Sequence, residues 1–225
     1  MHETRQSPAW VWDQLWIRLL AAVEDRQSPW RTPVLATLDG ATLDGATLDG
    51  ATLDGATLDG ATLDGHLPAA RTVILRDVMP QSRQLVAHVD RRSPKINQLQ
   101  WNPHASWTFY DPAAAIQLRV MSQISLHTED ELASSQWSKT PASSRKSYLS
   151  TEAPGAPLPG PISTLPAELR GRDLTEQELL AGRPNFCVLL ARVLEIDWYD
   201  LHPAGHLRLK FDCRAEQVDH QWIAT

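Results

Sequence analysis

Two arginines that frame a short apolar segment could bind anionic groups. Arg71 and Arg76 enclose Thr-Val-Ile-Leu, so polar and apolar residues alternate along this segment. In a strand, successive side chains point to opposite faces, so the two guanidinium groups would lie on different faces unless a bulge intervenes. One arginine could then bind a phosphate and the other a second anion. The alternative is that both are solvated arginines at the ends of a strand.

Further polar residues could extend this chemistry. Ser-Pro-Lys at 93–95 is the start pattern of a helix, where free backbone N–H groups and a lysine together favour an anion. Gln117 lies in an apolar strand pattern, so its amide needs a partner, either a cofactor ring or a neighbouring strand. His206, Arg208 and Lys210 alternate on one strand face, which is either a solvated edge or a basic wall for a phosphorylated substrate.

Hydrophobic patterns place the elements that must position these residues. Apolar residues at helical spacing predict a helix from Ser7 to Asp25. Further helices are expected over 93–100 and over 128–137, where Thr128 and Glu131 form a capping-box pattern. The predicted strands cover 32–38, 70–78, 84–89, 106–110, 115–127, 186–198, 206–213 and 221–223.

The order of these elements predicts the fold class. Most strands follow one another without an intervening helix, which favours antiparallel pairing in a closed or nearly closed barrel of six to eight strands. Five prolines within 151–168 predict a partly extended loop. We therefore expect a mainly β protein with flanking helices.

Composition excludes several classes of protein. The net charge of −6 argues against a general nucleic-acid binder, although a local basic pocket is still allowed. Cys187 and Cys213 lack the spacing of a metal site or a disulfide framework, so we expect two buried thiols and no metal. The first residues lack the apolar core of a signal peptide, and no segment has the length of a membrane span. The expected location is the cytoplasm, without a membrane or nucleic-acid partner.

Six identical copies of Ala-Thr-Leu-Asp-Gly fill residues 36–65. They could be a copied turn, a small β-helix, or a binding arm whose aspartates hold calcium weakly. Without five of the copies, the flanking residues form the pattern strand, Asp-Gly turn, strand. This favours an insertion at the tip of the first hairpin, as a flexible or protruding loop within a single domain that spans 1–225.

Taken together, four segments resemble pyridoxamine 5′-phosphate oxidase. Their order and spacing match that family from about Pro33 to Thr128 once the repeat is left out, and looser similarity continues to Phe211. The chain is similar to a divergent branch of the family. The matching segments are Arg71–Arg76, Leu85–Lys95, Gln98–Pro103 and Ile116–Val120.

The resemblance implies a split β-barrel that forms a homodimer and binds FMN at two sites across the subunit interface. It assigns the FMN phosphate to Arg71 and Lys95, and it places the strand from Arg71 to Arg76 along the flavin. His88, Val89 and Gln117 would lie beside the flavin ring. The other residues that the resemblance assigns to the cofactor are Thr72, Val73, Ile74, Leu75, Trp198, Tyr199 and Lys210.

The resemblance also implies an activity, the oxidation of pyridoxamine or pyridoxine 5′-phosphate to pyridoxal 5′-phosphate with O₂ as acceptor. Arg76, His206 and Arg208 are the candidates for binding this phosphorylated substrate, and no residue is assigned to catalysis. Pro94 stands where the family has a second phosphate-binding arginine. The alternative is an FMN-binding protein of the same fold with another redox substrate or without turnover.

Overall fold

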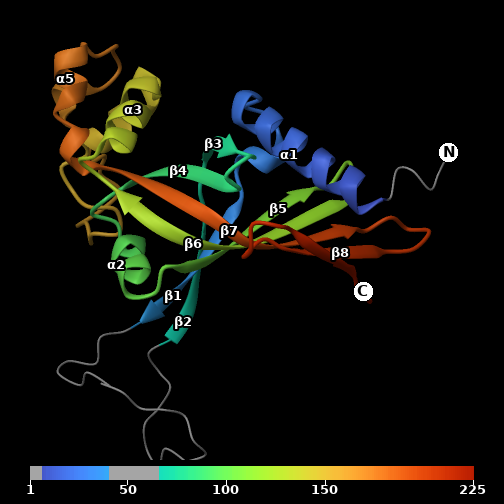
Figure 1. Ribbon diagram of the computed structural model, residues 1–225. Coiled ribbons are helices and arrows are strands. Elements are labelled where there is room, and N and C mark those ends of the chain that lie inside the picture. Colours follow the sequence, from blue (N-terminus) through green and yellow to red (C-terminus); the bar gives the residue numbers. More distant parts are fainter. Residues whose placement is uncertain (1–6, 41–65) are drawn as a thin grey trace, which may run out of the picture.

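A curved antiparallel sheet forms the centre of the molecule (Figure 1). The computed structural model describes residues 7–40 and 66–225, and within them nine strands join one sheet. All of their pairings are antiparallel. The strands are β1 (Val34–Gly40), β2 (His66–Thr72), β3 (Leu75–Met79), β4 (Gln84–Asp90), β5 (His104–Asp111), β6 (Ile116–His127), β7 (Phe186–Asp200), β8 (Leu207–Asp212) and β9 (Asp219–Trp222).

The strand order requires the sheet to curl. Its main path is β2-β1-β5-β6-β7-β4-β3, and β8 and β9 extend from β7. β2 and β3 lie at the two ends of this path, although only Val73 and Ile74 separate them in the chain. The backbone N–H of Val73 donates to the carbonyl oxygen of Pro33 at 3.0 Å, which ties this link to the start of β1. The expected antiparallel split barrel with flanking helices is therefore confirmed.

The hydrophobic core fills the inside of the curled sheet because apolar residues alternate along its strands. On β5, Ala105, Trp107 and Phe109 are buried, whereas their neighbours are half-buried or exposed. α1 (Pro8–Glu24) covers the core with Leu15 and Leu19. Full burial of one large apolar side chain contributes roughly 1.5–3 kcal/mol, so this layer holds the helix on the sheet.

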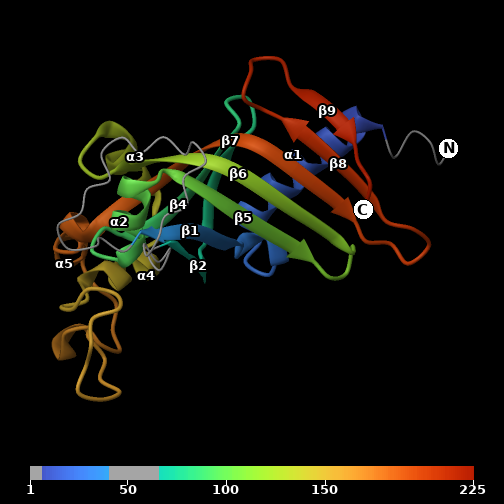
Figure 2. The same cartoon turned by 90° about the horizontal axis from the view of Figure 1, so that it is seen from below.

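The remaining helices gather mainly at the end of the sheet opposite β8 (Figures 1 and 2). There Trp137, Tyr148 and Phe186 pack against one another in a second, smaller apolar cluster. These helices are α2 (Pro94–Trp101), α3 (Glu131–Lys139), α4 (Ala142–Arg145) and α5 (Glu176–Leu180), with 3₁₀ turns η2 (Pro29–Arg31), η3 (Lys146–Leu149), η4 (Ala167–Leu169) and η5 (Arg183–Asn185).

The predicted strand over 70–78 is wrong as a continuous element. It is divided between β2 and β3 because the chain leaves one edge of the sheet at Val73 and joins the other edge at Leu75. A register shift between Leu75 and Asp77 adds a second irregularity. This division also explains why the described residues contain nine strands where six to eight were expected.

The predicted capping box at Thr128 and Glu131 is also wrong. α3 begins at Glu131, and its N-cap is Asp130, whose carboxylate accepts a hydrogen bond from the backbone N–H of Ala133. By contrast, Ser7 caps α1 as predicted, because its hydroxyl accepts from the backbone N–H of Trp10 at 3.2 Å. Asp is as good an N-cap as Ser, so the helix starts two residues later than the Thr128 pattern indicated.

The proline-rich segment 151–168 is a loop up to η4, as predicted, and its ends are joined. The backbone N–H of Thr151 donates to the carbonyl oxygen of Thr164 at 2.9 Å. The hydroxyl groups of Ser150 and Thr164 lie 2.6 Å apart. We call residues 151–164 the strap, because these contacts close them into a compact loop of the kind that often carries function.

The first copy of the repeat is part of β1. Gly40, its last residue, is the register partner of His66, the first residue of β2. The other five copies, at 41–65, lie outside the described residues. The insertion therefore joins the facing ends of two paired antiparallel strands.

The two thiols are buried and unpaired. Cys187 is 0 % exposed, and Cys213 is 3 % exposed. Burial raises the pKa of each thiol to about 11. In the described part of the chain, no helix combines the length and apolar character needed to cross a membrane.

Deletion of residues 41–65 should leave the fold intact. It would join Gly40 to His66 as the two central residues of a hairpin turn, and Gly at the first position suits a type II′ turn. The shorter connection also costs less entropy to close. We expect cooperative thermal unfolding, by circular dichroism, at a midpoint equal to or above that of the full chain. A non-cooperative transition would show that the insertion supports the sheet.

Candidate functional site

Arg71 is held in place by two polar residues of neighbouring elements. Its guanidinium donates to the side-chain oxygen of Gln98 at 3.0 Å and to the hydroxyl of Thr37. Thr37 in turn donates to the same Gln98 oxygen at 2.6 Å. Both partners are almost completely buried. Arg71 thus stands in a fixed orientation between β1 and α2.

Lys95 lies near Arg71 at the start of α2. Its ammonium donates to the hydroxyl of Ser93 at 2.9 Å. Ser93 occupies the N-cap position, but its hydroxyl donates to the carbonyl oxygen of Asp90 and does not cap the helix. Burial lowers the pKa of Lys95, and the positive charge of Arg71 lowers it further.

These two cations fit a phosphate group. Neither forms an ion pair with any residue that the structure describes, although Asp39 lies within electrostatic reach of Arg71. Burial lowers the pKa of Arg71, as it does that of Lys95. Two half-buried charges of like sign are unfavourable together, and a bound dianion would offset this cost.

Arg76 forms a second cationic position, directed toward α4. One terminal nitrogen donates to the hydroxyl of Ser144 at 3.3 Å. Its Nε is buried and has no partner among the described residues. Burial lowers the pKa of Arg76, and the nearby Tyr148 opposes this shift. An anionic ligand could pair with this nitrogen and its charge.

The remaining residues of the predicted FMN strand divide between core and surface. Val73 and Leu75 are buried in the core, so only their backbones can contact a ligand. Thr72 and Ile74 are exposed. The strand pattern left room for a bulge between Arg71 and Arg76. In the structure, the break between β2 and β3 separates the two arginines and places Arg71 beside α2 and Arg76 beside α4.

His88 belongs to a hydrogen-bonded chain of side chains. The Gln136 amide nitrogen donates to Asp77 at 2.9 Å, so the amide oxygen faces His88 Nε2, 3.1 Å away, and the proton must be on Nε2. The Thr140 hydroxyl lies 3.2 Å from the other ring nitrogen, Nδ1. Burial lowers the pKa of His88 to about 4, so the ring is neutral at pH 7. Nδ1 lies against the Thr140 hydroxyl, whose own proton is donated to the backbone carbonyl oxygen of Gln136 at 2.7 Å. The hydrogen bond to Gln136 and this contact hold the ring, and His88 therefore serves as a fixed wall.

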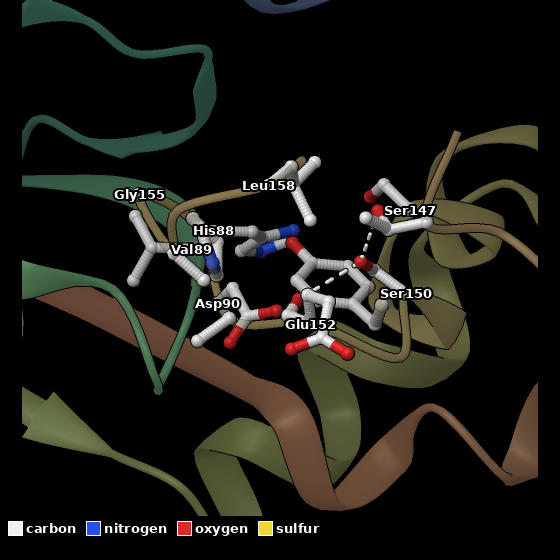
Figure 3. Close-up of a pocket in the computed structure, with 13 residues that line it drawn as sticks. His88, Val89, Asp90, Ser147, Ser150, Glu152, Gly155 and Leu158 are labelled. Atoms are coloured by element: carbon white, nitrogen blue, oxygen red, sulfur yellow. Dashed lines mark hydrogen bonds between the residues drawn. The ribbon is translucent and has the colours of Figure 1, made fainter. Parts of the chain in front are cut away.

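Figure 3 shows the cavity that His88 lines. Its volume is about 460 Å³, which lies within the range of small-molecule sites. β4 contributes His88, Val89 and Asp90 to one wall, and η3, Ser150 and the strap contribute the others. The predicted pair His88–Val89 therefore lies beside a cavity large enough for a small-molecule ligand.

The predicted residues on β6, β7 and β8 lie at the end of the sheet opposite α2 (Figures 1 and 2). Gln117 of β6 is the register partner of Tyr199 of β7, which in turn faces Arg208 of β8. Trp198 is buried and 6.4 Å from the ring of Trp222, so it faces the core side rather than the side of Tyr199. His206 is exposed just before β8 and is not part of the strand, contrary to prediction.

The cations at this end are already paired. Asp197 accepts hydrogen bonds from Arg119 and, at 2.8 Å, from Arg208. The Arg208 guanidinium also lies 4.5 Å from the centre of the Tyr199 ring. Lys210 forms an ion pair with Glu195 at 2.7 Å. Within one chain, these residues are separate from Arg71, Lys95 and His88.

Sequence reasoning missed the side chains that orient the site. Thr37 and Gln98 hold Arg71, and Gln136 and Thr140 hold His88. Gln98 lies in a matching segment, but nothing in the order of residues indicated its contact with Arg71. Tyr148, which lines the cavity, carried no signal beyond its apolar helical surroundings.

Comparisons with known proteins agree with the fold. Residues 27–128 match the family model described as pyridoxamine 5′-phosphate oxidase, FMN-binding domain. A pyridoxamine 5′-phosphate oxidase-related, FMN-binding protein from Nostoc punctiforme superposes with a TM-score of 0.65 at 20% identity, covering 97% of this chain and 98% of that one. PhzG from Burkholderia lata, in complex with tetrahydrophenazine-1-carboxylic acid, gives 0.61 at 14% identity, covering 100% and 97%. The search of curated proteins found no match.

The buried His88 should make stability depend on pH. Its folded pKa of about 4 lies below the ordinary value of 6.5, so the unfolded chain binds the proton more readily between these values. The contribution is complete above pH 6.5 and is lost as the pH falls toward 4. Lowering the pH from 7 to 5 should cost about 2 kcal/mol through this group.

The variant His88→Phe isolates that contribution. It should be less stable than the wild type at pH 7, because Gln136 loses its partner, but its stability should fall by about 2 kcal/mol less between pH 7 and pH 5 in urea unfolding. His104→Phe, at an exposed position, is the matched control and should follow the wild type. Equal pH dependence of all three proteins would contradict the assignment.

Proposed function

We propose that this protein is an FMN-dependent oxidoreductase acting on a small molecule, because residues 27–128 match the family model described as pyridoxamine 5′-phosphate oxidase, FMN-binding domain. The observation that carries the proposal is the pair of half-buried cations, Arg71 and Lys95, without an ion-pair partner in the described chain. Bound FMN supplies a two-electron acceptor, and the protein supplies binding, orientation and charge.

Arg71 and Lys95 hold the FMN phosphate in this proposal. Gln98 and Thr37 keep the Arg71 guanidinium in place, so little side-chain freedom is lost when the phosphate binds. Lys95 is positioned by Ser93 in the same way. The chain 71–76 and the pair His88–Val89 then lie along the flavin.

Two copies of the chain are needed to complete the proposed site. Gln117, Tyr199 and Lys210 lie at the end of the sheet opposite α2 and cannot reach a ligand held by Arg71 of the same chain. A second copy can supply them across an interface. Exposed side chains on the outer sheet face support this pairing, because Val34, Tyr110 and Met121 are 41%, 48% and 40% exposed.

The substrate in the leading proposal is pyridoxamine or pyridoxine 5′-phosphate. Arg76 is the best-supported candidate for the substrate anion, because its Nε lacks a partner and Ser144 orients the group. The neutral ring of His88 forms a fixed wall beside the substrate. Two buried, unpaired thiols suit the reducing cytoplasm in which we place the reaction.

The second proposal is a different redox substrate. It is favoured by the ion pairs that the cations at the β8 end of the sheet already form. Arg208 and Lys210 are neutralised by Asp197 and Glu195, so they offer little net charge to a phosphate. His206 is exposed outside the strand. On this proposal, the protein retains FMN but accepts a substrate with no phosphate group.

The variant Lys95→Met should weaken binding of FMN about tenfold, because one charge-assisted contact to phosphate is lost. Binding of riboflavin, which has no phosphate, should be nearly unchanged. The measurement is a titration of the apoprotein followed by flavin fluorescence. Lys139→Met, at an exposed position in α3, is the matched control. Equal losses for FMN and riboflavin would show that Lys95 does not bind the phosphate.

The activity is tested on the FMN-loaded protein with pyridoxamine 5′-phosphate and pyridoxine 5′-phosphate under air. The leading proposal expects pyridoxal 5′-phosphate and hydrogen peroxide in equal amounts, measured by absorbance and by a coupled peroxidase. A yellow protein without either product supports the second proposal. A protein that takes up no FMN would refute both.

A further inference from the structure

Ser125, His127 and Asp130 form a hydrogen-bonded row that the proposed FMN site does not use. Ser125 and His127 are two residues apart on β6, so both side chains point to the outer face of the sheet. The Ser125 hydroxyl oxygen lies 2.7 Å from Nε2 of His127, and Nδ1 of the same ring lies 2.5 Å from a carboxylate oxygen of Asp130. Serine hydrolases connect the same atoms in the same order.

Asp130 determines which nitrogen of His127 carries the proton. One of its carboxylate oxygens accepts from the backbone N–H of Ala133 at 2.9 Å, and the other faces Nδ1. The backbone bond, together with His127, lowers the pKa of the Asp130 carboxyl, so it is ionised and can only accept. In a neutral ring the proton is therefore on Nδ1, and Nε2 accepts from the Ser125 hydroxyl. The Leu190 carbonyl oxygen is a weaker alternative acceptor, because it lies 3.4 Å from that hydroxyl.

A cation on the neighbouring strand lies close to the serine. Leu190 of β7 is the register partner of Ser125, and Arg192 lies two residues further along β7, opposite Gln123. Such diagonal neighbours are roughly 7–8 Å apart, which a long side chain can span. The Arg192 guanidinium donates to the side-chain oxygen of Gln123 at 3.0 Å and forms no ion pair with the described residues. It can therefore stabilise negative charge that develops beside Ser125.

A cavity of about 310 Å³ adjoins the end of β6. Thr128, which follows His127, lines it and is three residues from Ser125, so the cavity begins within roughly 10 Å of the serine along the chain. Its volume is at the lower end of the range for small-molecule sites, which leaves room for one part of a small ester. The lining residues are Arg91, Thr128, Glu129, Arg183 and Pro184.

We propose that the Ser125–His127–Asp130 row is a second reactive site, in which Ser125 is the nucleophile toward small carboxylic esters. This activity goes beyond the proposed function, because it needs no flavin and uses residues at the end of β6 that adjoins α3 (Figure 1). Asp130 holds the His127 ring and stabilises its positive charge, and Arg192 stabilises the oxyanion.

The reaction has two halves, with water as the second reactant. First, the Ser125 oxygen bonds to the ester carbonyl carbon and its proton passes to Nε2 of His127. The bond from that carbon to the alcohol oxygen then breaks, and His127 gives the proton to the leaving alcohol. In the second half, water attacks the acyl carbon and its proton passes to Nε2. The acid leaves as the carbon–serine bond breaks, and the proton returns to the Ser125 oxygen.

Covalent labelling of the full chain with diisopropyl fluorophosphate tests the nucleophile. The Ser125 oxygen bonds to phosphorus as fluoride leaves, so mass spectrometry of the digested protein should find the added group on the peptide that contains Ser125. Ser125→Ala should remove this label. Ser138→Ala should retain it, because Ser138 is an exposed serine of α3 whose hydroxyl donates to the carbonyl oxygen of Ser135. A wild type without label on Ser125 would overturn the proposal.

Asp130→Asn separates an activated serine from one that is merely exposed. Asn caps a helix as well as Asp does, so α3 should keep its first turn. Its amide group would face Nδ1 with N–H donors, which moves the ring proton to Nε2 and removes the acceptor for Ser125. In serine hydrolases this change lowers the rate about ten thousandfold, and at this more exposed row we expect about a hundredfold slower labelling. An unchanged rate in the folded variant would overturn the proposal.

Hydrolysis of 4-nitrophenyl acetate, measured by the absorbance of nitrophenolate, tests turnover. Ser125→Ala should lower the rate of the wild type at least about tenfold, whereas Ser138→Ala should leave it unchanged. Arg192→Met should lower it about tenfold, since one donor to the oxyanion is lost. Equal rates for the wild type and Ser125→Ala would contradict the esterase activity, and an unchanged rate in Arg192→Met would contradict the role of that arginine. Removal of FMN should not change any of these rates, so failure of the flavin function is seen separately.

Discussion

The link between β2 and β3 constrains the rest of the structure. Two residues, Val73 and Ile74, must join strands that lie at the two ends of the sheet path. The sheet can satisfy this short connection only by curling until its edges approach, and the hydrogen bond from Val73 to Pro33 holds the link against the start of β1. The core, the break in the strand and the separation of Arg71 from Arg76 all follow from this geometry. A longer link would let the sheet stay open.

Charge is distributed unevenly over the curled sheet. At the end that holds α2, Arg71 and Lys95 form no ion pair with the described residues, whereas at the β8 end Asp197 and Glu195 neutralise Arg119, Arg208 and Lys210. Half-buried charges without an oppositely charged partner in the chain lower the stability of the folded protein. Proteins keep such unfavourable charges at sites where a bound ligand stabilises them.

Much of the fold could be predicted from the sequence, because strand alternation and short turns are local signals. The long strand β6 and the helix capped by Ser7 are examples. The break at Val73 could not be predicted, because residues 70–78 alternate as in a continuous strand and only closure of the sheet divides them. In the candidate site, Arg71 and Lys95 were predicted from the resemblance to a family motif. The partners Thr37, Gln136 and Thr140 were not, because they approach from distant segments with no signal of their own.

The burial of Cys187 and Cys213 has a consequence for the proposed oxidase, whose reaction would release peroxide. Sulfur is oxidised as the thiolate, and a thiol with a pKa of about 11 is ionised to roughly one part in ten thousand at pH 7. Both sulfurs are also shielded from solvent by the core. In the proposed oxidase, both cysteines would therefore resist the peroxide product, since sulfenic acid would form on neither at an appreciable rate.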